Sequence, residues 1–188
     1  MDIHAVILAA GRGKRMQSDL PKVLHVLGGR PLLWHVLDQV KSAGIPSATV
    51  VVSYKKELVI DSVNAWVQSN PGLSINFTDQ GEPKGTGHAL LSAESAVPAG
   101  KDVAVCLGDV PGIQAKTLSG IYNDFKASSP AALVVSMKLP DPKGYGRIVR
   151  SADNTIRAIT EEKDATDEIR KIDEVNTGIF FLQGATLW

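Results

Sequence analysis

The sequence has a single cysteine, few aromatic residues, no excess of charge of either sign and no long apolar run. Because Cys106 has no second cysteine to pair with, a disulfide-bonded secreted scaffold is excluded. The 20 lysines and arginines balance the 20 acidic residues, so we expect no nucleic-acid partner and only local basic patches. No apolar run has the length of a membrane span. We therefore expect a cytoplasmic protein with neither a secretory leader nor a membrane partner.

Apolar segments alternate with segments of helical periodicity over the first three quarters of the chain. The expected strands are residues 3–10, 48–52, 73–78, 103–107 and 131–137, and the expected helices are 31–40, 55–67, 87–96 and 115–126. This alternation is typical of an α/β domain with a mostly parallel sheet and helices on both faces. With 188 residues, 44% of them hydrophobic, the chain can form one such domain with a sizeable core.

The pattern changes after Pro140, where turn-forming residues dominate. Short strands are expected at residues 147–150 and 155–160, with a last strand at 177–182. The charged stretch from residue 161 to 171 is typical of a solvated surface segment. A further helix is expected to begin near Trp188. We therefore expect a single domain over residues 1–188 that is truncated at its C-terminus.

A glycine-rich, cationic loop follows the first expected strand. Gly11 and Gly13 can adopt backbone angles closed to other residues and let the chain pass close to a ligand. Successive N–H groups in such a turn form a concavity for anions, beside the cations at positions 12, 14 and 15. Met16 replaces the third glycine of the dinucleotide-binding fingerprint and no Gly-Lys-Ser/Thr follows, which excludes that fingerprint and a P-loop. The loop predicts a phosphate site of another kind, with an ordinary Gly-x-Gly turn as the alternative.

Glycines and polar residues also follow the third and fourth expected strands. Ligands of open α/β sheets bind beyond the carboxyl ends of the strands, so these positions are candidates for the same site. Gly85 and Thr86 lead into a helix, which lets a base or a phosphate approach the backbone. Asp109 is an oxygen ligand of the kind that Mg²⁺ takes together with substrate phosphates. A helix cap is the alternative for Asp109. The four histidines share no metal-ligand spacing and receive no catalytic role.

These features occur in an order that resembles one known family. The motifs are Leu8-x-x-Gly11-x-Gly13-x-Arg15-Met16, Pro21-Lys22, Gln80, Gly85-Thr86-Gly87-His88-Ala89, Gly108-Asp109-Val110-Pro111, Gly144-Tyr145-Gly146-Arg147, Glu161-x-Lys163-Asp164-Ala165 and Glu174-x-Asn176-Thr177-Gly178. The opening motif resembles that of the sugar-1-phosphate nucleotidyltransferases. The later blocks are similar to those of the uridyltransferase domain of bifunctional N-acetylglucosamine-1-phosphate uridyltransferases. This resemblance covers nearly the whole chain and implies the Rossmann-like fold of the nucleotide-diphospho-sugar transferases.

The resemblance implies a reaction and a role for each motif residue. UMP would pass from UTP to N-acetylglucosamine 1-phosphate by Mg²⁺-assisted in-line attack, giving pyrophosphate and UDP-N-acetylglucosamine for cell-wall synthesis. The residues implied to lie against the nucleotide are Leu8, Ala9, Ala10, Gly11 and Gly13, with Gln80, Gly85 and Thr86 holding the uracil. The implied catalytic residues are Arg15 and Lys22, which would contact phosphates, and Asp109, which would bind Mg²⁺. Gly146, Glu161 and Asn176 would hold the N-acetylglucosamine moiety.

The chain departs from the family pattern in two places and lacks part of the family's length. Gly112 stands where relatives usually carry leucine, and Glu82-Pro83-Lys84 is unusual before the Gly-Thr-Gly block. The family's domain continues with an asparagine as a second Mg²⁺ ligand, and the full-length protein adds a β-helix acetyltransferase domain that builds a trimer. Two alternatives therefore stand: a nucleotidyltransferase for another sugar 1-phosphate, or a nucleotide-sugar-binding module inactive through truncation.

Overall fold

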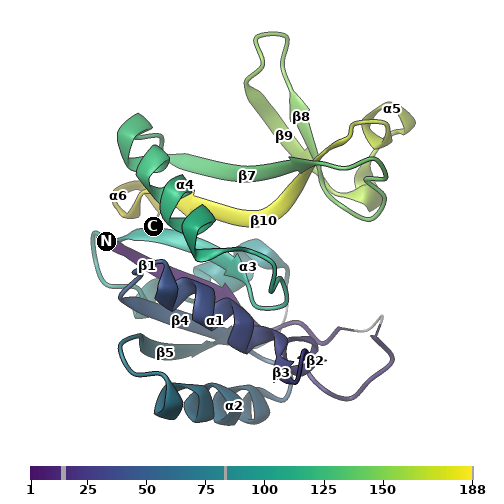
Figure 1. Cartoon of the computed structure of the whole chain (residues 1–188). Coiled ribbons are helices and arrows are strands. Elements are labelled where there is room, and N and C mark those ends of the chain that lie inside the picture. The colour runs from purple at the N-terminus through teal and green to yellow at the C-terminus, as the bar shows by residue number, and fades with distance from the viewer. Residues whose placement is uncertain (14–15, 83, 188) are drawn as a thin grey trace. The chain divides into compact units, whose positions relative to one another are not determined.

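The computed structural model describes residues 1–13, 16–82 and 84–187 of the chain (Figure 1). These residues form two compact units. Unit 1 comprises Met1–Leu133 together with Phe180–Trp188, and unit 2 comprises Val134–Ile179. Each unit has its own secondary structure and is described separately.

Unit 1 is built on a parallel sheet. Its strands stand in the order β5 (Ser74–Asp79), β4 (Ser47–Val52), β1 (Ile3–Leu8) and β6 (Asp102–Leu107), and the end of β10 (Glu174–Leu182) pairs antiparallel with β6. The continuous apolar runs of β1, β4 and β6 are buried almost throughout, as strands covered on both faces must be. The chain passes from β1 to β4 and β5 on one side, and returns to β6 on the other. The direction of winding therefore reverses between β1 and β6, where open α/β sheets have their crevice.

Three helices cover one face of the unit 1 sheet. They are α1 (Leu32–Ser42), α2 (Lys56–Ser69) and α4 (Ala115–Ser128), and Figure 1 shows α1 in front of the strands with the other two beside it. Trp34 of α1 donates from Nε1 to the Ser62 carbonyl of α2 at 3.1 Å, which joins these helices.

The opposite face is covered by α3 (Thr86–Leu91) and the short 3-10 turn η3 (Glu94–Ala96). Ala89 and Ala93 pack there against valines of the sheet, including Val6 and Val105. Small residues on this side let the α3 segment lie close to the strands. The first turn of α3 is thereby held near the carboxyl ends of β1 and β6.

Two unusual side chains are buried in the unit 1 sheet. His4 is fully buried in β1, with Nδ1 2.7 Å from Ser47 Oγ and Nε2 2.8 Å from Thr49 Oγ1 on β4. This burial lowers the pKa of His4 to about 4. Cys106 in β6 is 1% exposed, and burial raises the pKa of its thiol to about 12. Both side chains are part of the core, and we assign neither of them a chemical role.

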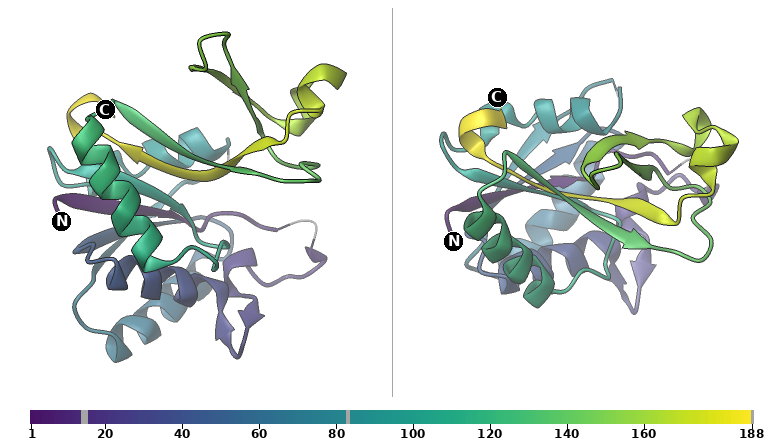
Figure 2. Two further views of the ribbon diagram at one scale, coloured as in Figure 1. Left: turned by 45° about the horizontal axis from the view of Figure 1, so that its top comes forward. Right: turned by 90° about the horizontal axis from the view of Figure 1, so that it is seen from above.

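Unit 2 is antiparallel. It contains most of β7 (Ala132–Lys138), the hairpin of β8 (Arg147–Arg150) and β9 (Ile156–Thr160), and the first part of β10. β10 pairs with both β7 and β8, and Figure 2 shows β7 and β10 running side by side. After β9 come the 3-10 turn η4 (Glu162–Asp164) and the short helix α5 (Asp167–Arg170).

Most expected elements are confirmed, with boundaries within one or two residues, but β10 begins at Glu174, three residues before the strand expected over 177–182. One expected helix is divided, and one hairpin was not expected. The helix expected over residues 87–96 is instead α3 followed by η3, because Ser92 and Ala93 form a turn between them. The small hairpin of β2 (Val26–Leu27) and β3 (Arg30–Pro31) was not predicted, although its Gly28–Gly29 turn is a hairpin signal. The expected last helix, α6 (Gly184–Leu187), begins before Trp188, which lies outside the described residues.

Candidate functional site

A cavity of about 300 Å³ opens in unit 1 where the strand order reverses. The segments that follow β1, β5 and β6 form its walls, together with the first turn of α3. Its lining residues are Leu8, Ala10, Gly11, Lys22, Val23, Gln80, Gly85, Thr86, Ala89, Leu107 and Asp109. The structure therefore brings together most of the unit 1 residues proposed from the sequence. Ala9 lies under the surface at 2% exposure and donates its N–H to Val51.

The glycine-rich loop places two glycines with different constraints. A Cβ atom on Gly11 would meet nothing within 4 Å, and its φ is not positive, so neither packing nor backbone requires glycine there. Its open space belongs to the cavity that it lines. Gly13 has φ +68°, and a Cβ atom there would lie 2.9 Å from the Cβ atom of Lys22. Gly13 therefore lets the chain pass close behind Lys22. Arg15, the third residue of the expected catalytic set, lies outside the described residues.

Gln80 is fixed at the end of β5 by its neighbours. Its backbone N–H donates to Val52, and its side-chain Nε2 donates to the Gly85 carbonyl at 3.1 Å. The same nitrogen lies 3.2 Å from Nδ1 of His88. Both amide hydrogens are thus occupied, while Oε1 makes no hydrogen bond within the described part of the chain. A buried amide in this orientation offers an acceptor to a ligand that carries an N–H group.

Lys22 and Asp109 meet in the cavity as an ion pair between Nζ and Oδ2. Lys22 begins the 3-10 turn η2 (Lys22–Leu24), and Asp109 follows β6 after Gly108. A Cβ atom on Gly108 would lie 3.0 Å from the Leu8 carbonyl oxygen and 3.1 Å from Val23. Glycine is therefore needed for the close approach that delivers Asp109 to the cavity. Because an ammonium and a carboxylate lie side by side, the cavity can bind both the anionic and the cationic parts of a ligand.

The donor set for a metal ion is small. Among residues 1–13, 16–82 and 84–187, no three His, Cys, Asp or Glu side chains gather as a metal site. Of the residues that the structure describes, Asp109 alone contributes a carboxylate to the cavity. One carboxylate fits Mg²⁺, which usually binds through one or two carboxylates plus substrate phosphates and water. It does not fit a metal held entirely by protein.

The three residues proposed to hold a sugar lie together in unit 2. The Asn176 N–H donates to the Gly146 carbonyl at 2.8 Å, and a Cβ atom on Gly146 would lie 3.2 Å from Glu161 Oε1. Asn176 Oδ1 accepts the Gly178 N–H at 2.9 Å, which orients its amide. Glu161 is exposed, so its carboxylate is accessible. These contacts build one small polar cluster.

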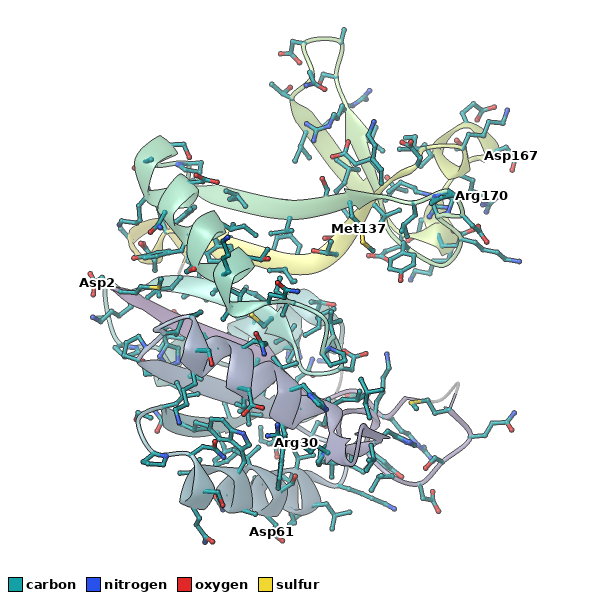
Figure 3. The ribbon with its side chains drawn as sticks, viewed as in Figure 1. Asp2, Arg30, Asp61, Met137, Asp167 and Arg170 are labelled. Atoms are coloured by element: carbon teal, nitrogen blue, oxygen red, sulfur yellow. The ribbon has the colours of Figure 1, made fainter. Side chains whose placement is uncertain are left out.

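A network of charges surrounds the cluster in unit 2. Arg147 is 2% exposed and donates from Nη2 to Glu162 Oε2 at 2.8 Å, while the Gly144 N–H donates to the same oxygen at 3.0 Å. These bonds, the Gly144 one first, hold the pKa of Glu162 below its usual range. Arg170 pairs with Asp167 at 2.9 Å on α5, where Figure 3 labels both. The charged stretch of residues 161–171 is largely exposed, as expected, but Glu162 within it forms an ion pair with the buried side chain of Arg147.

Sequence reasoning missed several residues that shape unit 1's cavity. Val23, Ala89 and Leu107 contribute to its apolar lining. Val23 follows the Pro21-Lys22 motif, Ala89 ends the motif that begins at Gly85, and Leu107 ends β6, yet none of them was proposed for the site. His88 received no role, yet it contacts the amide of Gln80. That contact joins the end of β5 to α3, and no spacing in the sequence reveals it.

The comparisons with known proteins agree with this geometry. Residues 5–175 match the family profile of the MobA-like NTP transferase domain. The bifunctional protein GlmU of Syntrophomonas wolfei is 43% identical over 180 residues, which are 96% of this chain and 38% of that protein. GlmU of Cupriavidus metallidurans is 42% identical over 185 residues, covering 98% of this chain and 39% of its own. The chain thus spans about two fifths of the length of these curated relatives.

Solved structures share the fold. An apo UDP-glucose pyrophosphorylase superposes with a TM-score of 0.78 at 18% identity, over 98% of this chain and 78% of that one. At this identity the likeness concerns the fold alone.

Within the described residues, no helix has both the length and the apolar character needed to cross a bilayer.

Proposed function

This chain belongs to the family of MobA-like NTP transferase domains, and from that premise we propose that it transfers UMP from UTP to N-acetylglucosamine 1-phosphate. The family assignment makes the chain a nucleotidyltransferase. The proposal adds the donor, the acceptor and Mg²⁺. The sequence identity of about two fifths to proteins named GlmU supports N-acetylglucosamine 1-phosphate as the acceptor over other sugar phosphates.

The observation that carries the proposal is the Lys22–Asp109 pair inside a glycine-lined cavity. Nucleotidyl transfer needs reactants held in line and charge on the phosphates neutralised, with little covalent chemistry from the protein. A phosphate oxygen of the sugar phosphate would attack the α-phosphorus of UTP while the bond to pyrophosphate breaks. Lys22 would neutralise charge on the phosphates, and the backbone at Gly11 would lie against them.

Gln80 supports uracil as the base. Its amide hydrogens are already engaged, so it presents an oxygen acceptor toward the cavity. Uracil carries an N–H donor at the matching edge of its ring, whereas cytosine has an unprotonated ring nitrogen there. The buried amide would leave that nitrogen unpaired, which disfavours cytosine. Gly85 and Thr86 would flank the base from the start of α3.

Asp109 would hold Mg²⁺ in this proposal. Its carboxylate lies in the cavity at 19% side-chain exposure, and the remaining ligands would be phosphate oxygens and water. The bound ion would supply positive charge on the triphosphate. We expect Lys22, the present partner of Asp109, to turn to the phosphates when they bind. In unit 2, Gly146, Glu161 and Asn176 would hold the N-acetylglucosamine moiety.

The test is pyrophosphate release from UTP and N-acetylglucosamine 1-phosphate on this chain, with Mg²⁺ and with excess EDTA. We expect release only with metal, and at a much lower rate with CTP or with glucose 1-phosphate. Equal rates with glucose 1-phosphate would move the proposal to another sugar. Binding of UDP-N-acetylglucosamine without any pyrophosphate release would make the chain a binding module rather than an enzyme.

A further inference from the structure

Tyr54 touches both arms of the glycine-rich loop. It lies in the connection between β4 and α2, outside the cavity described above. The guanidinium carbon of Arg12, on the first arm, lies 5.0 Å from the centroid of the Tyr54 ring. The Tyr54 hydroxyl reaches the carbonyl of Asp19, on the second arm, at 3.4 Å. One half-buried side chain therefore links the beginning and the end of the loop.

The segment that carries Tyr54 is itself firmly held. Ser53 donates from Oγ to the Gly81 carbonyl at 2.7 Å, and Lys56 pairs with Asp79 at 2.7 Å. Lys55 adopts φ +47°, a left-handed conformation that is uncommon outside glycine. These contacts anchor the connection to the end of β5. Tyr54 is thus a fixed support, whereas an exposed arginine without a partner samples many rotamers.

In the sequence, Arg12 directly follows a residue that lines the cavity described above. Gly11 lines the 300 Å³ cavity, and Arg12 lines a second, more open cavity of about 500 Å³ with Gln17, Ser18 and Asp19. A triphosphate whose α-phosphate lies near Lys22 extends two further phosphates beyond that point. A second polar space that is lined by Arg12, the residue after Gly11, offers a guanidinium to those anionic groups.

We infer that Tyr54 is a positioning residue that holds the Arg12 guanidinium where it contacts the β- and γ-phosphates of the nucleotide. The inference rests on the proposed function and adds a residue to it. Tyr54 acts through Arg12 and touches no substrate itself. A cation over an exposed aromatic ring changes an equilibrium constant by about two- to fivefold, which sets the size of the effect.

The test compares the affinities of UTP and UMP, because only UTP carries the outer phosphates. Calorimetry with Mg²⁺ present would be run on the wild type, Tyr54→Leu, Tyr54→Phe, Arg12→Gln and the double variant Tyr54→Leu/Arg12→Gln. We expect Tyr54→Leu to weaken UTP about two- to fivefold and to leave UMP unchanged. Tyr54→Phe keeps the ring and should bind UTP like the wild type. Tyr54→Gln is a second ring-free variant should Tyr54→Leu fail to melt cooperatively.

The double variant separates positioning from general support. If Tyr54 acts through Arg12, removing the ring in the Arg12→Gln background should cause no further loss of UTP affinity. Arg30→Gln is the matched control, because the guanidinium carbon of Arg30, which Figure 3 labels, lies 5.8 Å from the centroid of the Trp34 ring and Arg30 lines neither cavity. That change should alter thermal stability and leave UTP binding intact.

Three results would overturn the inference alone: additive losses in the double variant, equal losses for UMP and UTP, or a Tyr54→Phe variant as weak as Tyr54→Leu. Each would leave UTP binding by the wild type in place. Absence of UTP binding by the wild type would instead overturn the proposed function together with the inference.

Discussion

At the scale of single residues, Lys22 and Asp109 carry the charges proposed to act on phosphate and metal. Replacing either with alanine should lower turnover at least about 100-fold, the usual cost of removing one electrostatic stabiliser. Steady-state pyrophosphate release measures the loss. Lys22 is 38% exposed and Asp109 19% exposed on their side chains, so a thermal melt should show that both variants still fold. Lys101→Ala, which breaks the exposed pair with Asp2 at the amino ends of β1 and β6, is the control. Near-wild-type turnover in either test variant would remove that residue from the proposed mechanism.

His4 makes the stability of unit 1 depend on pH. Its folded pKa is about 4, below the ordinary value of 6.5 that the unfolded chain keeps. The unfolded state therefore binds a proton first as pH falls, so the free energy of unfolding should decrease between pH 6.5 and about 4. Carboxylates with lowered pKa values, such as Glu174 at about 2, lose their contribution only below about pH 4.5. Urea unfolding at pH 7.5 and 5 isolates the histidine.

A matched pair of variants checks the assignment of this pH dependence. His4→Gln should flatten the decline between pH 7.5 and 5, whereas His35→Gln, at the surface beside Leu27, should not. An unchanged slope in His4→Gln would show that another group titrates in this window.

Sequence reasoning reached the residues whose motif fixes their position and missed those defined by long-range contact. Asp109 was identified because the strand ends of a parallel sheet converge on one edge, Lys22 and Gln80 were identified by the family resemblance, and all three line the cavity. The Tyr54–Arg12 contact joins residues 42 positions apart through side chains alone, so no periodicity announces it. The structure supplies what the sequence pattern lacks, namely which loops face one another.

At the scale of elements, the first turn of α3 depends on one glycine conformation. Gly85 has φ +107° and ψ 178°, a combination essentially confined to glycine. A Cβ atom there meets nothing within 4 Å, so Gly85→Ala would strain the backbone without a clash. We expect a loss of about 1–3 kcal/mol in unfolding free energy. UTP affinity should fall as well, since the Gly85 carbonyl accepts from Gln80.

Gly87, two residues later and inside α3, is the matched control. It has no positive φ and equally open space, so alanine should stabilise the helix by about 0.5–1 kcal/mol through propensity. Urea unfolding of both variants measures the contrast. Equal effects of the two substitutions would refute the argument from backbone conformation.

Element prediction succeeded where burial made the pattern simple. The continuous apolar runs of β1, β4 and β6 identified buried parallel strands, since both faces are covered. The β2–β3 hairpin has two exposed apolar residues, Val26 and Leu27, and too few positions to show alternation. At the break between α3 and η3, the Ser92 hydroxyl donates to the Ala89 carbonyl, and the Ser92 carbonyl accepts from the Thr78 hydroxyl on β5. The second bond is a long-range contact that the local sequence pattern does not show.

At the scale of the whole molecule, the proposed roles divide between the two units. Every residue proposed for the nucleotide lies in unit 1, and Gly146, Glu161 and Asn176 lie in unit 2. Glu161→Gln should therefore raise the KM for N-acetylglucosamine 1-phosphate about tenfold, the cost of losing a charged hydrogen bond. The KM for UTP should stay unchanged. Initial-rate kinetics with each substrate varied in turn gives both values, and a parallel rise in both would contradict the division.

Because Cys106 is buried, the native molecule presents almost no thiol that reacts with a labelling reagent. Only thiolates react with maleimides, and a thiol with a pKa of about 12 inside β6 presents almost none. Because the chain has no other cysteine, one introduced at an exposed position would accept a single fluorophore without any other change. The slow rate at which Cys106 itself reacts with the maleimide would then measure how often the centre of unit 1 opens to solvent.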